Sequence, residues 1–175
     1  MKPVAASGVE ARWSTFLGKV RARLGEILEE ADAGLTDIIA TEVIDPGPMS
    51  AAQNEVKARL FALREKIGPA WAKLEPEFGE HAGNLEDQGR ALETEIMNAI
   101  EAFEAQTMKK YRARLTELAH EELKERRLAC SKCAAPLPEP AVKHRVENVT
   151  CTHCHAINTV RPGLAMAMLG PPKKS

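Results

Sequence analysis

The sequence predicts a mainly α-helical protein, an antiparallel helical bundle or coiled coil that ends in a small β-structured module. Three observations indicate this fold class. Three apolar stripes with helical spacing precede residue 128, and turn residues separate them. Aromatic residues make up only 4% of the 175 residues and charged residues 28%, which suits long helices better than a sheet core. All four cysteines follow residue 128, where prolines end the helical pattern.

The first predicted helix covers about residues 9–31, where apolar residues recur at threes and fours from Val9 and Trp13 to Ala31. Gly34 either ends this helix or lies within a stripe that continues to Val43. The first definite stop is the Asp-Pro-Gly-Pro turn at residues 45–48.

The second predicted helix starts near Ser50, a plausible N-cap, and its stripe runs from Val56 to Leu74. Pro69 has no N–H and should kink or end this helix. A further interruption is predicted around residues 76–83, which contain Pro76 and two glycines. We expect the large aromatic residues of the stripes to be core residues without a ligand role: Trp13, Phe16, Trp71 and Phe103.

The third predicted helix spans residues 85–128, contains no proline and has Gly89 as its only glycine. Its apolar spacing stays near 3.6, which favours an almost straight helix packed on neighbours. Its charges come in blocks that suit a solvated face with pairs such as Glu122–Arg126, or alternatively a groove for a partner. Since this helix is longer than the second, part of it should project or pair with another copy, so residues 1–128 are predicted as a bundle that can form homo-oligomers.

The cysteines form two C-x-x-C pairs, Cys130/Cys133 and Cys151/Cys154, with seventeen residues between the pairs. This spacing predicts one tetrahedral Zn²⁺ site, made of two turns that face each other across a hairpin of residues 144–150 and 157–160. Four thiolates leave no open position on the metal, so we expect one structural zinc per chain that provides most of the folding energy of residues 129–163. Residues 164–175 are predicted to be a flexible tail.

Other uses of these cysteines are open. The run Cys151-Thr-His-Cys-His155 matches the C-x-x-C-H pattern of c-type haem attachment. Four thiolates also bind iron, as in rubredoxin-like sites, and a zinc-linked thiol switch uses the same set. A Cys₃His site would use His153 or His155 in place of one cysteine.

The segment from Cys130-Ser-Lys-Cys-Ala-Ala-Pro-Leu to Val149-Thr-Cys-Thr-His-Cys-His-Ala resembles the bacterial four-cysteine zinc ribbons, whose usual form is C-x-x-C-G-A-x-L, a hairpin and V-x-C-P-x-C-G. Ala134 and His155 stand where that pattern prefers glycine, which predicts strained turns. The layout of a long helix followed by C-x-x-C, seventeen residues and C-x-x-C is also similar to the DksA/TraR regulators, which implies binding to RNA polymerase. The acidic Asp-x-x-Asp-Ala tip of that family has no match at residues 45–48.

Charge and motifs narrow the expected function. The net charge is −1, and from Cys130 onward six Lys or Arg face two Glu, so the C-terminal module is mildly basic. No export signal, no apolar run of about 20 residues and no catalytic constellation is visible, so we expect a cytoplasmic, non-enzymatic protein away from membranes. The leading hypothesis is a helical scaffold or oligomerisation element whose zinc ribbon docks a protein partner. The alternative is a transcription-linked or nucleic-acid-binding regulator whose phosphate contacts are Lys132, Lys143, Arg145 and Arg161.

Overall fold

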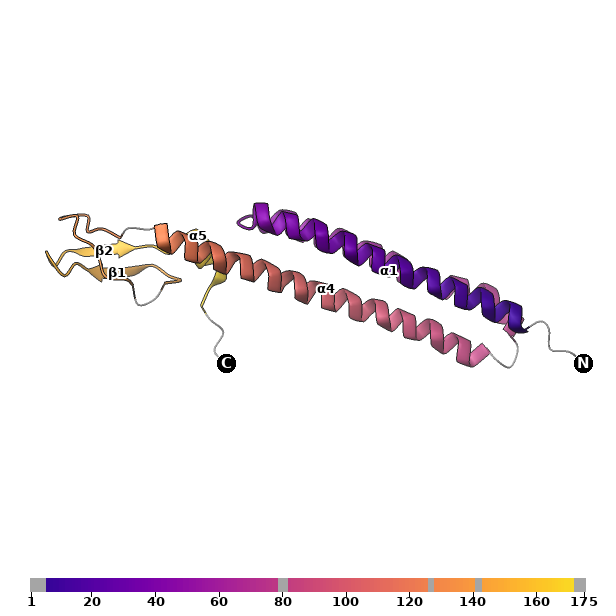
Figure 1. The fold of residues 1–175 in the computed structure, drawn as a ribbon. Coiled ribbons are helices and arrows are strands. Elements are labelled where there is room, and N and C mark those ends of the chain that lie inside the picture. The colour runs from indigo at the N-terminus through magenta and orange to yellow at the C-terminus, as the bar shows by residue number, and fades with distance from the viewer. Residues whose placement is uncertain (1–5, 79–81, 126–127, 141–142, 172–175) are drawn as a thin grey trace, which may run out of the picture. The chain divides into compact units, whose positions relative to one another are not determined.

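The computed structural model describes residues 6–78, 82–125, 128–140 and 143–171. Its elements in chain order are α1 (Ala6–Glu42), α2 (Pro46–Arg64), α3 (Ile67–Phe78), α4 (Ala82–Glu125), β1 (Glu147–Thr150), β2 (Ile157–Val160) and α5 (Leu164–Leu169). The predicted fold class, mainly α with a small C-terminal β element, is confirmed (Figure 1). The chain divides into two compact units, Met1–Ile38 with Pro46–Met108 and Ile39–Asp45 with Lys109–Ser175. The predicted boundary after residue 128 stays a prediction.

The helices of the first unit pack lengthwise, and α2 and α3 share one direction. Arg12 of α1 pairs with Glu77 of α3, and Glu30 of α1 pairs with Arg59 of α2. From the first pair to the second, the residue number rises in α1 and falls in the partner helices. Helices α2 and α3 therefore run antiparallel to α1. This antiparallel arrangement packs the first predicted stripe, on α1, against the second, on α2 and α3.

Helices α1 and α4 run in the same direction within the first unit (Figure 1). Trp13 lies opposite Leu85, and Arg21 Nε lies 3.0 Å from a carboxylate oxygen of Glu95. Trp13 is fully buried, and its indole N–H donates to the carbonyl oxygen of Leu85 at 2.8 Å. At Gly89 an added Cβ would lie 2.9 Å from Cζ2 of Trp13, so the glycine permits this close approach.

The helix boundaries differ in part from those predicted. Helix α1 continues past Gly34 to Glu42, because an apolar stripe outweighs the propensity cost of about 1 kcal/mol for a glycine. The N-cap prediction at Ser50 is wrong: α2 begins at Pro46, since the first turn of a helix does not need the N–H that proline lacks. The predicted interruption near Pro69 falls instead at residues 65–66, and Pro69 lies in the first turn of α3.

The third predicted helix is continuous from Ala82 to Glu125. The end predicted at residue 128 and the pair Glu122–Arg126 involve residues 126–127, which lie outside the described residues. In the described part of the chain, no helix combines the length and the apolar character needed to span a membrane.

In the second unit, β1 and β2 form an antiparallel hairpin in which Val149 lies opposite Asn158. The first strand is shorter than predicted, four residues from Glu147 to Thr150. Residues 164–169, which we expected in a flexible tail, form α5 instead, and residues 172–175 lie outside the described residues.

A contact with α4 explains this helix. The N–H of Ala165 donates to Oε1 of Glu122 at 3.2 Å, and Ala165 is fully buried. An added Cβ on Gly163 would lie 1.9 Å from Oε2 of Glu122, so the glycine lets this carboxylate reach the first turn of α5. The sequence pattern missed α5 because its stabilising partner lies on another element.

Candidate metal centre

The four cysteine sulfurs meet at one point in the second unit. All four Sγ atoms lie within 4.8 Å of one another, with Cys130 to Cys154 at 3.5 Å and Cys133 to Cys151 at 3.7 Å. These distances are far longer than a disulfide bond of about 2.05 Å. They match the edge of a tetrahedron with metal–sulfur bonds of about 2.3 Å, which is about 3.8 Å. The residues therefore fit a four-thiolate metal ion, as the C-x-x-C spacing predicts.

Two backbone turns with the same hydrogen bonds hold the sulfurs, and we call them the first knuckle (residues 130–135) and the second knuckle (residues 151–156). In the first knuckle, Cys130 N–H donates to the Ala135 carbonyl at 2.8 Å and Ala134 N–H to the Cys130 carbonyl at 2.9 Å. The corresponding bonds of the second knuckle, from Cys151 to Ala156 and from His155 to Cys151, measure 2.9 and 3.0 Å. The repetition indicates two copies of one turn, each of which presents two cysteines to the same point.

Each knuckle also directs a backbone N–H at the sulfur of its first cysteine. Lys132 N–H donates to Sγ of Cys130 and His153 N–H to Sγ of Cys151, both at 3.4 Å. Such hydrogen bonds favour the thiolate over the thiol, and the thiolate is the form that binds metal.

The fifth residue of each knuckle has a left-handed backbone. Ala134 has φ 59° and His155 has φ 58°, and among the described residues these are the non-glycine residues with positive φ. Glycine adopts this conformation without the clash of a Cβ, whereas other L-residues pay about 1–2 kcal/mol. The strained turns that the sequence predicts at these two positions are therefore present.

Asn158 joins the two knuckles, although it belongs to none of the motifs that the sequence predicts as a site. Its side-chain Oδ1 accepts from the N–H and the hydroxyl of Ser131 at 2.9 and 3.0 Å. Its Nδ2 donates to the Ala156 carbonyl at 3.0 Å and approaches Sγ of Cys130 at 3.6 Å. Only 7% of Asn158 is exposed, so its polar groups depend on these partners. The sequence does contain a signal for this role. Exposed and buried residues alternate along β2, and Asn158 is a polar residue at one of the buried positions.

The same contacts shift the pKa values of the thiols in opposite directions. The N–H groups of Cys133 and Lys132 lower the pKa of Cys130 to about 6, and those of Cys154 and His153 lower the pKa of Cys151. For Cys133 the Ala135 N–H lowers the pKa, but the Cys154 sulfur, burial and the other sulfurs outweigh it and raise it to about 12. Without a cation, thiolates this close repel one another, and a divalent cation removes that repulsion.

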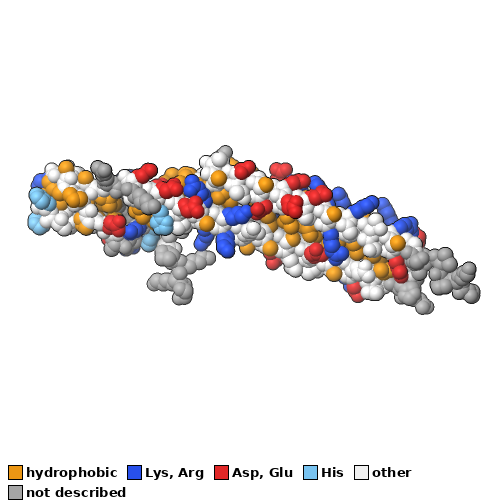
Figure 2. Space-filling model, viewed as in Figure 1, with side chains coloured by type: hydrophobic (Ala, Val, Ile, Leu, Met, Phe, Trp, Pro, Cys, Tyr) orange, Lys and Arg blue, Asp and Glu red, His pale blue; other side chains and the backbone are white. Residues whose placement is uncertain are grey.

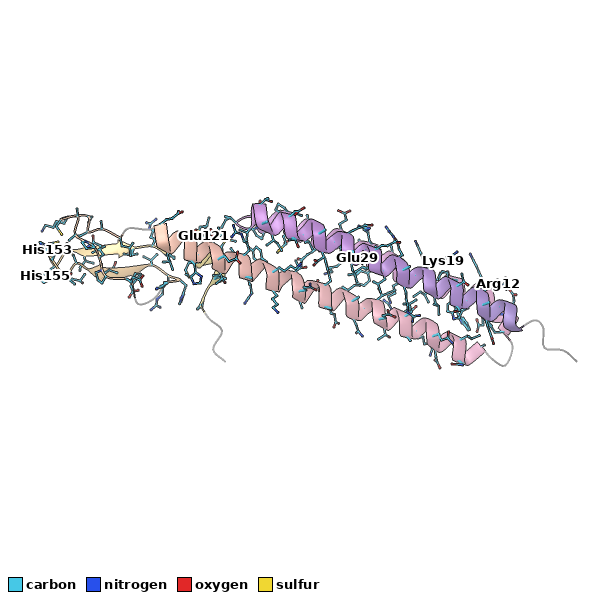
Figure 3. All side chains as sticks on the ribbon, in the orientation of Figure 1. Arg12, Lys19, Glu29, Glu121, His153 and His155 are labelled. Carbon is cyan, nitrogen blue, oxygen red and sulfur yellow. The ribbon has the colours of Figure 1, made fainter. Side chains whose placement is uncertain are left out.

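The two histidines beside the cysteines are exposed. His153 and His155 lie at the second knuckle, at the end of the hairpin (Figure 3), and Figure 2 shows histidine side chains on the molecular surface there. Among the described residues, the group of side chains close enough to share the metal contains the four cysteines and no histidine. This geometry favours the four-cysteine set over a Cys₃His set.

The basic residues predicted as phosphate contacts fall into two places. Lys143, Arg145 and Arg161 line one cavity of the second unit, while Lys132 lies on the first knuckle outside it. All four are exposed.

Comparison of the chain with protein-family models, with curated proteins and with solved structures gives no match.

Proposed function

We propose that the chain is a non-enzymatic, zinc-binding protein in which a helical scaffold carries a structural zinc ribbon, and that the ribbon docks a protein partner. The observation that carries the metal part is the meeting of four cysteine sulfurs within 4.8 Å, at distances that suit tetrahedral coordination. A thiolate set of this kind is typical of structural zinc. Zinc would link the two knuckles and stabilise the hairpin.

The structural role of the metal follows from the composition of the site. The four sulfurs would complete a tetrahedral shell and leave no position for water or substrate, which a catalytic zinc requires. The ribbon also buries few apolar side chains of its own, chiefly Val149 and Val160. A small module with so little core depends on its metal for folding.

Partner docking is supported by apolar side chains that the second unit exposes. Val146, Ile157 and Leu164 are 55%, 70% and 57% exposed. Covering such side chains with a partner would be favourable, at about 25 cal/mol per Å² of apolar surface. In the first unit, Figure 2 shows acidic and basic side chains interspersed on the visible face, as on a solvated scaffold. We propose that its helices serve as spacer or as the contact between copies.

Metal analysis of the full chain tests the zinc assignment. We expect one zinc per chain, and Cys154→Ser should lose zinc or bind it at least about tenfold more weakly, since one of four ligands is removed. His155→Ala and His153→Ala are matched controls in the same knuckle and should keep full zinc. Full zinc in Cys154→Ser, or loss of zinc in a histidine variant, contradicts the four-thiolate assignment, and the visible colour of a ferric thiolate site would indicate iron.

Affinity capture from host-cell extract tests partner docking. The zinc-loaded wild-type chain and the Cys154→Ser chain serve as paired baits, with helical circular dichroism as the check that the variant keeps its helices. We expect proteins that the wild type retains and the variant does not. Identical sets from both baits contradict docking by the ribbon.

A nucleic-acid-binding regulator is the second candidate, because three of the four predicted phosphate contacts line one cavity. Binding of this kind weakens steeply with salt as counterions are released. Absence of association with DNA, RNA or RNA polymerase at low salt eliminates this candidate.

A further inference from the structure

The second unit contains a cavity of about 380 Å³ beside the metal centre. The end of α4, the first knuckle with the loop that follows it, and the end of β2 with the residues after it all contribute to its wall. Its volume falls in the lower part of the range of about 300–1,000 Å³ found for small-ligand sites. It therefore has room for apolar side chains of a bound segment, not for a folded domain.

We call the apolar part of the cavity lining the floor. It is formed by Leu123, Leu128, Pro136, Leu137, Pro140 and Val160. Val160 is buried and Leu123, Leu128 and Leu137 are half-buried, so the leucines keep apolar surface in contact with water. An apolar group of a ligand would cover that surface at a gain of about 25 cal/mol per Å².

We call the charged part of the cavity lining the rim, and its net charge is positive. Lys143 is partly neutralised by Glu139, whose carboxylate lies 2.9 Å from its Nζ. Arg145 and Arg161 form no ion pair with any described residue, and both are exposed. The lining therefore carries three cations and one carboxylate. Guanidinium groups hold carboxylates through paired hydrogen bonds, so this rim is complementary to acidic groups.

The lining favours a peptide over nucleic acid. Single-stranded nucleic acids bind through aromatic platforms on which the bases stack. The chain has no Phe, Tyr or Trp after Tyr111, so none is present in the cavity. A net charge of +2 on the lining also allows few phosphate contacts, whereas an apolar floor next to arginines suits a leucine-like side chain flanked by Asp or Glu.

We propose that this cavity is the docking site of the ribbon, and that it binds a peptide segment of a protein partner in which a large apolar side chain lies next to carboxylates. The inference rests on the proposed partner-docking function and specifies its site and the chemistry of its partner. The apolar side chain fills the cavity, and its acidic neighbours contact Arg145 and Arg161.

Selection from a phage-displayed library of random peptides on the immobilised, zinc-loaded full chain tests this proposal. We expect enriched peptides that combine a large apolar residue with adjacent Asp or Glu. Synthetic copies should bind Arg145→Glu and Arg161→Glu about tenfold or more weakly, since each variant loses a hydrogen bond between charged groups. Arg112→Glu makes the same charge change on an exposed residue of the second unit outside the cavity and should bind like the wild type. Leu137→Ser tests the floor and should also weaken binding, with unchanged zinc content as evidence that the ribbon is folded.

Three results would overturn the assignment of this cavity as a peptide-docking site. These results are the absence of enrichment, enriched peptides without acidic residues, and equal loss of binding in Arg161→Glu and Arg112→Glu. Binding of oligothymidine or duplex DNA that Arg145→Glu and Arg161→Glu abolish would identify nucleic acid as the occupant. A change of oligomeric state in the same variants, seen by sedimentation, would identify a second copy. If selection fails while affinity capture still gives partners that need the intact ribbon, the docking function stands and this site is wrong.

Discussion

Within the two knuckles, the backbone conformation is least favourable at Ala134 and His155. Both have a left-handed backbone, and both donate the N–H that closes the turn onto the carbonyl of the first cysteine. A Cβ in this conformation is strained, so the metal centre is held together against a cost at two positions. The flanking hydrogen bonds offset part of that cost, and the proposed zinc would offset the rest.

Replacing Ala134 by glycine should therefore stabilise the zinc-loaded ribbon. We expect a gain of about 0.5–1 kcal/mol, because relief of the strain exceeds the larger loss of backbone entropy for glycine. Ala135→Gly is the matched control: its φ is not positive, so the same change should destabilise by about 0.5–1 kcal/mol. Thermal unfolding of the zinc-loaded chain, followed through hairpin amide signals, measures both. If both variants are stabilised, or both destabilised, backbone strain at residue 134 is unimportant for stability.

Asn158 should control zinc affinity although it is not a ligand. Asn158→Ala removes the acceptor of Ser131 and the donor near the Cys130 sulfur, so we expect zinc to bind about 10–100-fold more weakly. Asn158→Asp keeps the acceptor but turns a carboxylate oxygen toward the thiolate, and should weaken zinc at least as much. Competition with a chromophoric chelator gives the affinities.

Asn148→Ala is the control for Asn158 within the same hairpin. Asn148 is exposed and accepts a hydrogen bond from the Thr159 hydroxyl at 3.0 Å, away from the sulfurs. Its loss should leave zinc affinity nearly unchanged. Equal effects at residues 148 and 158 would mean that the hairpin, not the bridge between knuckles, determines metal binding.

At the scale of the elements, Gly89 determines how closely α4 approaches α1. The Trp13 indole opposite it is fully buried, donates to the Leu85 carbonyl and lies against Trp71, with ring centroids 5.3 Å apart. The indole therefore has little room to move away from a new methyl group.

Gly89→Ala should destabilise the helical bundle. The new Cβ would stand 2.9 Å from Trp13, and such overpacking costs about 1–3 kcal/mol, more than the gain of about 1 kcal/mol in helix propensity. Gly25→Ala, in α1 with no atom within 4 Å of its added Cβ, should stabilise by about 1 kcal/mol. Denaturant unfolding followed by helical circular dichroism compares the two variants, and stabilisation by both contradicts the tight contact.

These elements also show which features the sequence could predict. Apolar periodicity depends on one helix at a time, so the stripes through Leu24, Leu60 and Ile96 correctly predicted buried faces. The spacing of paired cysteines likewise predicted the meeting of four sulfurs. The role of Asn158 depends on its register against Val149, and α5 depends on Glu122 of a different helix. A contact between two elements produces no periodic pattern in the sequence. The sequence therefore predicted neither the role of Asn158 nor helix α5.

At the scale of the whole molecule, the two compact units differ in what stabilises them. The first unit has a continuous apolar core, with Trp13, Leu60, Leu92 and Ile96 fully buried. The described part of the ribbon, residues 129–163, buries two valines and two cysteines, too little for a core that folds without metal.

Removal of the metal should therefore unfold the ribbon and spare the bundle. With excess chelator, we expect the amide signals of residues 147–160 to move to random-coil positions, while most of the helical circular dichroism remains. Acidification should act in the same direction, since folded-state pKa values of Cys130 and Cys151 below the usual thiol value mean that their contribution is lost as the pH falls and the thiolates are protonated. Restored zinc should restore the hairpin signals, with Cys154→Ser as a control that chelator leaves unchanged. Concerted loss of helical and hairpin signals would instead mean that the helices need the metal centre to fold, and that the scaffold and the ribbon form one cooperative unit.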